Sequence, residues 1–341
     1  MRIAINGYGR IGRCVLRACF EREDTSDLSI VSINELADHK AISYLTKFDS
    51  THGLFPGNVD YKASNNSSCS QLLINKERID LYNLKNISDL PWSNQDIDIL
   101  LECTGIITSK KLASEHNQAG AKKVILSNPG ESDIPAIVFG VNHQQDFCKE
   151  PIISAASCTS NALIPVLSIL DKTFGIENGV ITTIHASMHD QPVIDAYHSK
   201  DLRRNRAASQ SIIPVDTALA QGIGRVLPKL SGKFVAQALR VPVNNVSALN
   251  LTANLSTSVT LKDVNSCLQQ ASNQDLRGIL GYTNEPLASC DFNHDFHSGI
   301  VDANQTRVSN GNTINILIWF DNEWAFANRM LDIVLYLKSL G

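Results

Sequence analysis

The sequence lacks several patterns that would assign a chain to a class at once. Its eight cysteines form no CxxC pair and no cysteine–histidine spacing of the kind that binds zinc, which argues against a metal site and against a secreted disulfide framework. No apolar run reaches the roughly 20 residues of a membrane span. The formal net charge is −4, so no overall positive field favours nucleic acid or anionic membranes as partners.

The start of the chain also lacks the charged and apolar regions of a secretory signal, because MRIAINGYGRIG passes straight into an apolar run and glycines. We therefore expect a reducing, cytoplasmic environment. The chain has 341 residues, of which 43% are hydrophobic and 19% charged. This is ordinary globular composition, and the length exceeds one ordinary core, so we expect two domains.

What the sequence does contain begins with a short apolar run, RIAIN, followed by GYGRIG. Gly7, Gly9 and Gly12 have the G-x-G-x-x-G spacing, and a helical apolar pattern follows. In this setting the first glycine permits a tight turn, the second lets the backbone approach a pyrophosphate, and the third lets the helix pack close to the strand. The helix N-terminus then offers N–H groups to phosphates. The pattern predicts dinucleotide binding.

An acid follows at the end of the next apolar run, SIVSIN. Glu35 can accept both hydrogen bonds of a ribose diol and would repel a 2′-phosphate, so NAD is favoured over NADP. Taken alone, Glu35 could equally be a solvated acid at the end of a strand.

Apolar runs and helical patterns then alternate to about residue 157, which predicts a doubly wound parallel sheet. DIDILLECTG, KKVILSNPG, AIVFGVN and PIISAAS read as strands, SKKLASEHNQAGA as a helix, and the polar stretch at 63–71 as a hairpin tip. Ligands of such sheets bind beyond the C-terminal ends of the strands. Thr104, Ser127 and Cys158 all lie at such ends.

The second half reads as an α+β domain with a mainly antiparallel sheet, because FVAQALRVP and NVSALNLTANL alternate in hydropathy. His185 stands near the end of a β-branched strand, where a lone histidine is more often structural than catalytic. The loop at 190–214 is basic, which suits either solvent or an anion or subunit contact. Arg240 interrupts an apolar strand and needs a partner there, a phosphate or an acid.

Cys158 is the remaining question, since most buried cysteines are inert. Its neighbours Ala155, Ala156 and Ser157 are small and leave space around the sulfur, whereas large apolar residues would enclose a core cysteine. Cys158 also lies where a strand gives way to a helix, and a helix N-terminus together with an imidazolium lowers the pKa of a thiol. These features weaken the interpretation of Cys158 as a core cysteine and leave it open beside that of a reactive thiol.

Six motifs together resemble the glyceraldehyde-3-phosphate dehydrogenase family, in family order and over essentially the whole chain. They are INGYGRIGR, ASCTSN around Cys158, TTIHAS around His185, RAASQSIIP, LRVP at Arg240 and WFDNEW. The resemblance implies an NAD-binding domain at 1–157, completed by a C-terminal helix at 322–341, and a catalytic domain at 158–321. It also implies a cytoplasmic homotetramer in which the segment 188–214 is buried between subunits.

The resemblance implies the chemistry as well. Cys158 would attack a phosphorylated aldose to form a thiohemiacetal, and His185 would take the hydroxyl proton as hydride leaves, so that a thioester remains. The implied cofactor contacts are Gly7, Gly9, Arg10, Ile11, Gly12, Glu35, Thr104, Ser127 and Asn322, the last of which fixes the nicotinamide carboxamide. The implied substrate contacts are Ser157, Thr159, Arg206, Thr217 and Arg240.

Within the family, INELAD, MHDQPVIDAYH and DFNHDFHS resemble the branch that oxidises erythrose 4-phosphate with water as the deacylating group, on a route to pyridoxal phosphate. The glycolytic enzyme has threonines where this chain has Met188 and Asp190, and an alanine replaces the second cysteine of its SCTTNC motif. Two alternatives stay open. One is a phosphorylating glyceraldehyde-3-phosphate dehydrogenase, and the other is a non-catalytic NAD- or RNA-binding protein, which the Cys158/His185 pair and the net charge disfavour.

Overall fold

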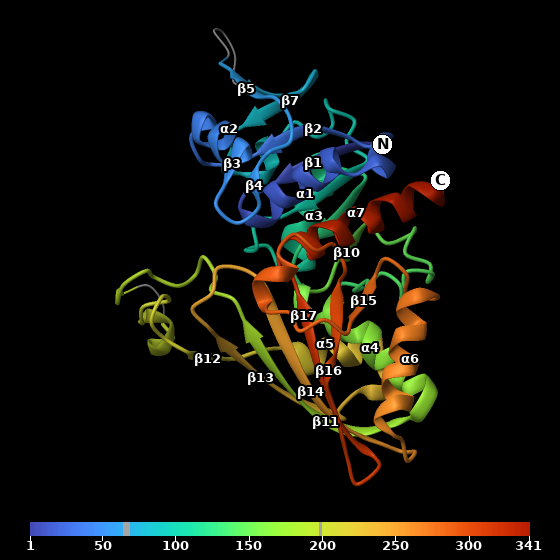
Figure 1. Cartoon of the computed structure of the whole chain (residues 1–341). Coiled ribbons are helices and arrows are strands. Elements are labelled where there is room, and N and C mark those ends of the chain that lie inside the picture. The colour runs from blue at the N-terminus through green and yellow to red at the C-terminus, as the bar shows by residue number, and fades with distance from the viewer. Residues whose placement is uncertain (64–68, 198–199) are drawn as a thin grey trace. The chain divides into compact units, whose positions relative to one another are not determined.

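The computed structural model describes residues 1–63, 69–197 and 200–341 (Figure 1). Its contacts divide the chain into two compact units. Unit 1 comprises residues 1–137, 143–157 and 327–341, and unit 2 comprises residues 138–142 and 158–326. Most of the hairpin tip expected at 63–71 lies outside the described residues, as does part of the MHDQPVIDAYH motif.

Unit 1 is built on a mixed eight-stranded sheet in the order β10-β9-β8-β1-β2-β7-β6-β5. All pairs from β10 to β7 are parallel, while β6 runs antiparallel to both of its neighbours. Its strands are β1 (Arg2–Asn6), β2 (Ser29–Asn34), β5 (Val59–Lys62), β6 (Ser70–Ile74), β7 (Glu77–Tyr82), β8 (Ile99–Glu102), β9 (Lys123–Leu126) and β10 (Ile152–Ser154). A small hairpin joins β3 (Phe48–Asp49) to β4 (Gly53–Leu54), and the helices are α1 (Arg10–Glu21), α2 (His39–Lys47) and α3 (Lys110–Gln118).

Unit 2 contains a seven-stranded sheet in the order β12-β13-β11-β14-β17-β16-β15. Its strands are β11 (Ile176–His185), β12 (Ile213–Val215), β13 (Phe234–Arg240), β14 (Ser247–Leu255), β15 (Leu280–Thr283), β16 (Gly299–Ser309) and β17 (Thr313–Phe320), and its helices are α4 (Cys158–Phe174), α5 (Leu219–Val226) and α6 (Leu261–Asn273). Four of its six strand pairs are antiparallel, and β11–β13 and β15–β16 are parallel. The predicted fold class, a Rossmann-type sheet followed by an α+β domain with a mainly antiparallel sheet, is confirmed.

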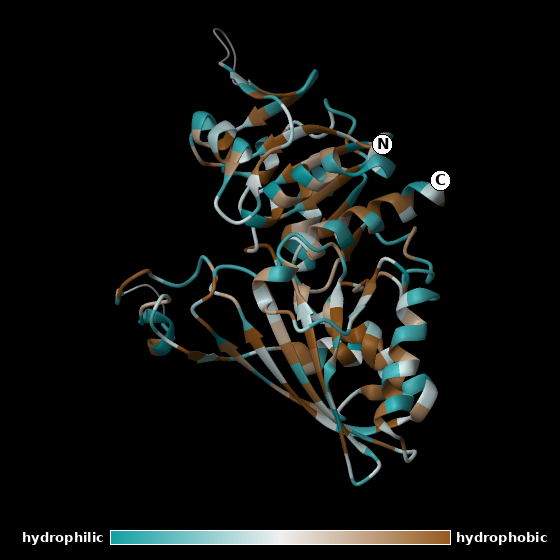
Figure 2. Cartoon of the chain, viewed as in Figure 1, coloured by the Kyte–Doolittle hydropathy of each residue, from teal (hydrophilic) through white to brown (hydrophobic). Residues whose placement is uncertain are grey.

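The two sheets show the burial that their strand directions require. In β1 the apolar residues Ile3, Ala4 and Ile5 are fully buried, as expected for a parallel strand covered on both faces. In β14 and β17 buried and half-buried residues alternate, because α4 packs against one face of this sheet. Figure 2 shows the corresponding concentration of hydrophobic residues in the strands and helices of each unit.

The C-terminal segment passes from a strand through a turn into a helix, and a helix here is what the resemblance implies. Asp321 follows β17, and both of its carboxylate oxygens accept hydrogen bonds. Oδ1 accepts them from the N–H groups of Glu323 and Trp324. Helix α7 (Trp324–Ser339) starts there. Its part within unit 1 is tied to the end of α1, because Arg22 forms an ion pair with Asp332 at 2.7 Å.

One predicted strand is wrong. The apolar run at 136–142 forms only a single bridge, between Ala136 and Ser154. The chain then turns, because Gly140 has a φ of +87° and the Asn142 side chain accepts a bond from the N–H of Val138. Ile137 and Val138 are nevertheless buried, so the apolar pattern reported burial rather than extended pairing. In the part of the chain that the structure describes, no helix has the length and apolar character to cross a membrane.

Candidate active site

The glycine turn between β1 and α1 has the geometry expected of a phosphate-binding loop. Gly7 has a φ of +86°, and a Cβ there would lie 2.5 Å from the backbone nitrogen of Thr104. A Cβ at Gly12 would collide with the carbonyl oxygen of Gly7, while one at Gly9 would meet nothing within 4 Å. Gly7 and Gly12 thus make the turn compact, and the open side at Gly9 leaves room for a pyrophosphate.

Two further cofactor candidates lie at the start of α1. Ile11 is half-buried, and the guanidinium of Arg10 forms a two-pronged ion pair with Asp49, at 2.5 and 3.1 Å. Although burial opposes it, this pairing holds the pKa of Asp49 well below its ordinary value. The side chain of Arg10 therefore joins the β3–β4 hairpin to the helix.

Glu35 follows β2 and lies beside the glycine turn. One of its oxygens accepts a 2.7 Å bond from the N–H of Tyr8, and the other accepts bonds from the N–H groups of Leu36 and Ala37. These bonds fix the carboxylate in position. A carboxylate oxygen has more than one acceptor site, so the group can still receive the hydroxyls of a ribose.

Thr104 is held by a buried polar network that the sequence did not reveal. Oε1 of Glu102 accepts bonds from the N–H and the hydroxyl of Thr104, and Oε2 accepts a bond from Asn6 at 2.6 Å. Trp92 donates to Nδ1 of His116, so Nε2 of that ring carries the proton and donates to Oε2 of Glu102 at 3.1 Å. Glu102 and His116 are fully buried. The network fixes the loop at the end of β8.

Ser127 stands at the equivalent place after β9, where its N–H donates to the carbonyl of Glu102 at 2.9 Å. Both Thr104 and Ser127 thus lie at the carboxyl ends of parallel strands, the edge where such sheets bind ligands. The signal that could have found Glu102 is an acid that closes an otherwise apolar run, ILLE.

The chain turns sharply between β10 and α4. Ala156 has a φ of +59°, a left-handed conformation that is uncommon for a residue with a side chain, and its N–H bonds to the hydroxyl of Ser154 at 2.9 Å. Strain of this kind often marks a functional segment. Ser157 is half-buried, and Cys158 is the first residue of α4.

Within unit 2, Cys158 lies beside His185. The sulfur is 3.7 Å from Nε2 of the ring and 3.8 Å from the hydroxyl of Thr159. Burial raises the pKa of the Cys158 thiol, and it outweighs the opposing effects of Thr159, of Arg240 and of the N–H groups at the start of α4. The expectation of a lowered thiol pKa is therefore wrong for this structure, because the site is desolvated.

His185 also has a cationic neighbour, Arg240. The parallel register of β11 and β13 sets Arg240 directly opposite His185, and a guanidinium nitrogen lies 2.8 Å from Nδ1 of the ring. The carbonyl oxygen of Ala186 lies 2.8 Å from the same nitrogen. Burial, with the charge of Arg240 next, lowers the pKa of His185 to about 4. The ring is neutral near pH 7.

Of the other predicted substrate residues, Arg206 is exposed and forms an ion pair with Asp195 at 2.8 Å. The Thr217 hydroxyl accepts a bond from the N–H of Leu219, and Thr217 lines a separate hollow along β12 and β13. Among the described residues, neither has a hydrogen bond or ion pair to the group around Cys158. Asp190 pairs with Arg204 at 3.1 Å and acts electrostatically on Arg240.

Asn322 is connected to the strand that carries His185. The hydroxyl of Ser247 donates to Oδ1 of Asn322 at 2.8 Å and accepts a bond from the N–H of Ala186 at 3.0 Å. All three residues are buried. Since its Oδ1 is engaged, Asn322 has its amide NH₂ left for a carboxamide oxygen. The small polar Ser247 at the start of an apolar strand is the one signal that could have pointed to this link.

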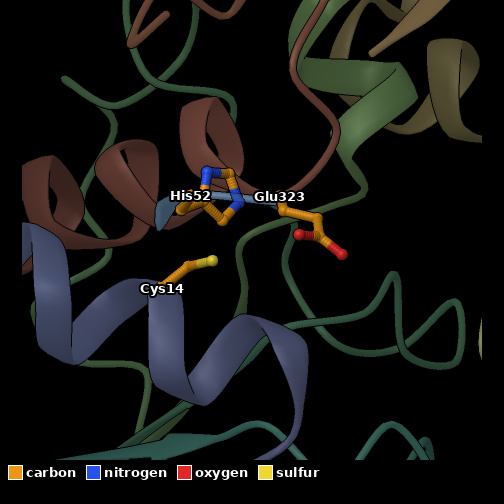
Figure 3. A group of neighbouring side chains, drawn as sticks. All are labelled: Cys14, His52 and Glu323. Atoms are coloured by element: carbon orange, nitrogen blue, oxygen red, sulfur yellow. The ribbon is translucent and has the colours of Figure 1, made fainter. Parts of the chain in front are cut away.

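Cys14 of α1 and His52, between β3 and β4, have possible ligand atoms within 4.8 Å of each other; Figure 3 draws them with Glu323 of unit 2. Unit 1 alone therefore supplies two ligands, fewer than the three or four protein ligands of a zinc site. We assign no metal to this pair.

Comparison with family models identifies both halves of the chain. Residues 1–110 match the NAD binding domain of glyceraldehyde 3-phosphate dehydrogenase, and residues 157–322 match the C-terminal domain of the same enzyme. The two matches define an NAD-dependent oxidoreductase that acts on a phosphorylated aldehyde. The chain belongs to the glyceraldehyde 3-phosphate dehydrogenase family, and its cofactor is NAD.

Proposed function

We propose that this chain oxidises D-erythrose 4-phosphate to 4-phosphoerythronate, a precursor on a route to pyridoxal phosphate. The observation that carries the chemistry is the contact between half-buried Cys158 and buried His185, beside half-buried Arg240. A thiol beside a neutral imidazole is the arrangement that nucleophilic catalysis on an aldehyde needs.

The reaction divides into three steps. The Cys158 thiol loses its proton as the sulfur bonds to the aldehyde carbon, and the carbonyl oxygen takes up a proton to complete a thiohemiacetal. His185 then removes the hydroxyl proton through Nε2, which lies on the side of the ring that faces Cys158. NAD, when bound, accepts the hydride. His185 releases its proton to solvent, and water hydrolyses the thioester that remains, which releases the acid and returns the thiol.

The residues around the site support the four-carbon substrate. Positions 188 and 190 offer a thioether and a carboxylate, so neither supplies the hydroxyl donors with which the glycolytic enzyme grips its triose phosphate. Asp190 is also an unfavourable neighbour for a phosphate. We place the substrate phosphate at Arg240, with Ser157, Thr159, Arg206 and Thr217 as the other proposed substrate contacts.

On the cofactor side, we propose that the glycine turn with Arg10 and Ile11 holds the pyrophosphate. Glu35 would bind the adenosine ribose, Thr104 and Ser127 would line the strand ends, and Asn322 would orient the carboxamide. The commitment of Asn322 Oδ1 to Ser247 supports this last role, because it leaves a donor for the carboxamide oxygen.

Steady-state kinetics with both aldehydes, with and without inorganic phosphate, tests the substrate. We expect kcat/KM for erythrose 4-phosphate to exceed that for glyceraldehyde 3-phosphate by at least about tenfold, since two lost hydrogen bonds to a dianion cost roughly 1.5–3 kcal/mol each. We also expect no phosphate requirement. Faster turnover of glyceraldehyde 3-phosphate with phosphate would assign the chain to the phosphorylating enzyme instead.

We further propose a cytoplasmic homotetramer. All eight cysteines are free, which suits a reducing compartment. The segment 188–214 carries exposed apolar side chains that a subunit interface would cover, among them Val193, Ile194, Leu202 and Ile212. Light scattering at micromolar concentration tests this, and a fully active monomer would contradict it.

A further inference from the structure

The carboxylate of Glu102 receives four hydrogen bonds in the interior of unit 1. This residue ends β8, and its side chain is fully buried. Oε1 accepts bonds from the N–H of Thr104, at 2.9 Å, and from its hydroxyl. Oε2 accepts bonds from the Asn6 amide at 2.6 Å and from Nε2 of His116 at 3.1 Å. Four donors match the four lone-pair sites of an ionised carboxylate, so Glu102 accepts at every position and donates at none.

The two donors to Oε2 are themselves fixed by their neighbours. Trp92 donates to Nδ1 of His116 at 3.1 Å, so the ring proton is on Nε2. Asn34 donates to Oδ1 of Asn6 at 2.8 Å, which turns the NH₂ of that amide towards the carboxylate. All four residues are buried. Because each has one arrangement that satisfies its partners, the carboxylate is held in one place and in one state.

This arrangement determines what the hydroxyl of Thr104 can do. Its single proton is given to Glu102, and its oxygen lies 3.3 Å from the N–H of Ile106, which donates to it. A hydroxyl oxygen has two lone pairs, so one is left. Thr104 is half-buried, just beyond the carboxyl end of β8. Towards a ligand it therefore offers only an acceptor, which suits a ligand hydroxyl and does not suit a phosphate oxygen.

The order of the strands indicates which part of the cofactor reaches this oxygen. Strand β1 lies between β8 and β2, so the glycine turn after β1 has Thr104 on one side and Glu35 on the other. The N–H of Tyr8 in the turn donates to Glu35 at 2.7 Å. On the other side, a Cβ on Gly7 would lie 2.5 Å from the backbone nitrogen of Thr104. A dinucleotide with its pyrophosphate at the turn has one ribose on each side, and the acid after β2 suits the adenosine ribose.

We propose that Glu102 is a positioning residue for the cofactor: it takes up the proton of the Thr104 hydroxyl, so that this oxygen accepts a hydrogen bond from a hydroxyl of the nicotinamide ribose. The inference rests on the proposed function only in its assignment of Thr104 to NAD. It adds the direction of the hydrogen bond, the part of the cofactor that makes it, and the buried residue that sets it. Asn6 and His116 keep Glu102 in place.

The binding of three ligands locates the effect along the cofactor. ADP carries the adenosine ribose and the pyrophosphate, ADP-ribose adds the second ribose, and NAD adds the nicotinamide. Glu102→Gln replaces one accepting oxygen by a donor. We expect its Kd for ADP-ribose and for NAD, measured by calorimetry, to rise about tenfold, and its Kd for ADP to change by less than about twofold. Glu77→Gln, which removes an exposed acid of β7, is the matched control.

Two variants of Thr104 show whether Glu102 acts through this hydroxyl. Thr104→Val removes the oxygen and keeps the shape, so it should weaken ADP-ribose and NAD as Glu102→Gln does, whereas Thr104→Ser should bind as the wild type. The double variant Glu102→Gln/Thr104→Val should bind no more weakly than Thr104→Val alone. Thermal unfolding confirms that each variant is folded. A residue that only stabilises the fold would add its loss to that of Thr104→Val and would weaken ADP as well.

The direction of the bond is tested in the wild type, with the network intact. Two NAD analogues carry fluorine in place of the 2′- or the 3′-hydroxyl of the nicotinamide ribose, which removes a donor. We expect one of them to bind the wild type about tenfold more weakly than NAD does, and to bind Thr104→Val as well as NAD does. Full affinity of both analogues for the wild type, or an equal loss of ADP and NAD in Glu102→Gln, would overturn the proposal. These titrations contain no aldehyde, so the substrate assay decides the proposed reaction separately.

Discussion

His116 in unit 1 and His185 in unit 2 are both buried, and each has partners on both ring nitrogens. Around His116 the tautomer is fixed, since Trp92 donates to Nδ1 and Nε2 donates to Glu102 at 3.1 Å; the Asn6 amide, 3.4 Å from Nε2, donates to Glu102 instead. Around His185 the partners conflict, because Arg240 and Ala186 require opposite states of Nδ1. A satisfied network fixes one tautomer and stabilises a loop. Around His185, the opposite requirements at Nδ1 leave the position of the ring proton unfixed, and a catalytic base needs a proton that can move.

The largest expected effect contrasts the cysteines of the two regions. Cys158→Ser should lower kcat by at least about a thousandfold with NAD affinity nearly unchanged, because a serine hydroxyl is a far weaker nucleophile than a thiol. Cys103→Ser, at the end of β8, is the matched control, since burial raises the pKa of that thiol and keeps it inert. Burst kinetics and cofactor titration measure both. An equal loss of kcat in Cys158→Ser and Cys103→Ser would contradict the assignment of Cys158 as the nucleophile and Cys103 as an inert buried thiol.

His185 should also make the free energy of unfolding depend on pH. The pKa of His185 falls from 6.5 to about 4 on folding, so between these values the unfolded chain binds a proton that the native chain does not. Stability is therefore lost as pH falls from 6.5 towards 4, by about 3 kcal/mol. Urea unfolding at several pH values should show this slope in the wild type and a flatter one in His185→Gln. The exposed His189→Gln is the control, and an identical slope in both variants would contradict the prediction.

Breaking the satisfied network should affect stability rather than chemistry. His116→Phe leaves one Glu102 oxygen with a donor fewer and the Trp92 N–H without an acceptor, which should lower the free energy of unfolding by roughly 2–3 kcal/mol. Saturating kcat should change little. Urea denaturation and kinetics on the same preparation measure the two quantities. A fall in kcat with unchanged stability would place His116 among the reactive groups.

The smallest effect concerns the cofactor. Glu35→Ala should weaken NAD binding by about tenfold and narrow its advantage over NADP, because a ribose acceptor and a charge that repels a 2′-phosphate are both removed. Titration with each cofactor measures this. Asp38→Ala, a change at the N-cap of α2 close in sequence, controls for loss of charge. Unchanged affinities would make Glu35 a surface acid.

Much of the fold could be predicted because it depends on local pattern. The strand, glycine turn and helix at the start of the chain are predicted from spacing alone. The strand predicted at 136–142 was wrong because hydrophobicity indicates burial. Burial does not distinguish a strand from a buried turn, here one fixed by Gly140 and Asn142.

In the site, too, local motifs could be predicted from the sequence, whereas contacts between distant residues could not. Motifs identified Cys158, His185 and Arg240, but the contacts among them depend on strand register, which brings Arg240 beside His185 across 55 residues of chain. Ser247 was missed for this reason, since its partner Asn322 is 75 residues away. The pKa of Cys158 was predicted in the wrong direction because desolvation is a property of the folded site.

Unit 1 contains residues 327–341, and Arg22 holds this segment through Asp332 and the backbone of Asn328. During translation, the ribosome makes all of unit 2 before it makes these residues. Unit 1 therefore begins first and is completed last, and until residues 327–341 are made Arg22 lacks its partners there, in contrast to the usual order in which an N-terminal domain folds as it emerges.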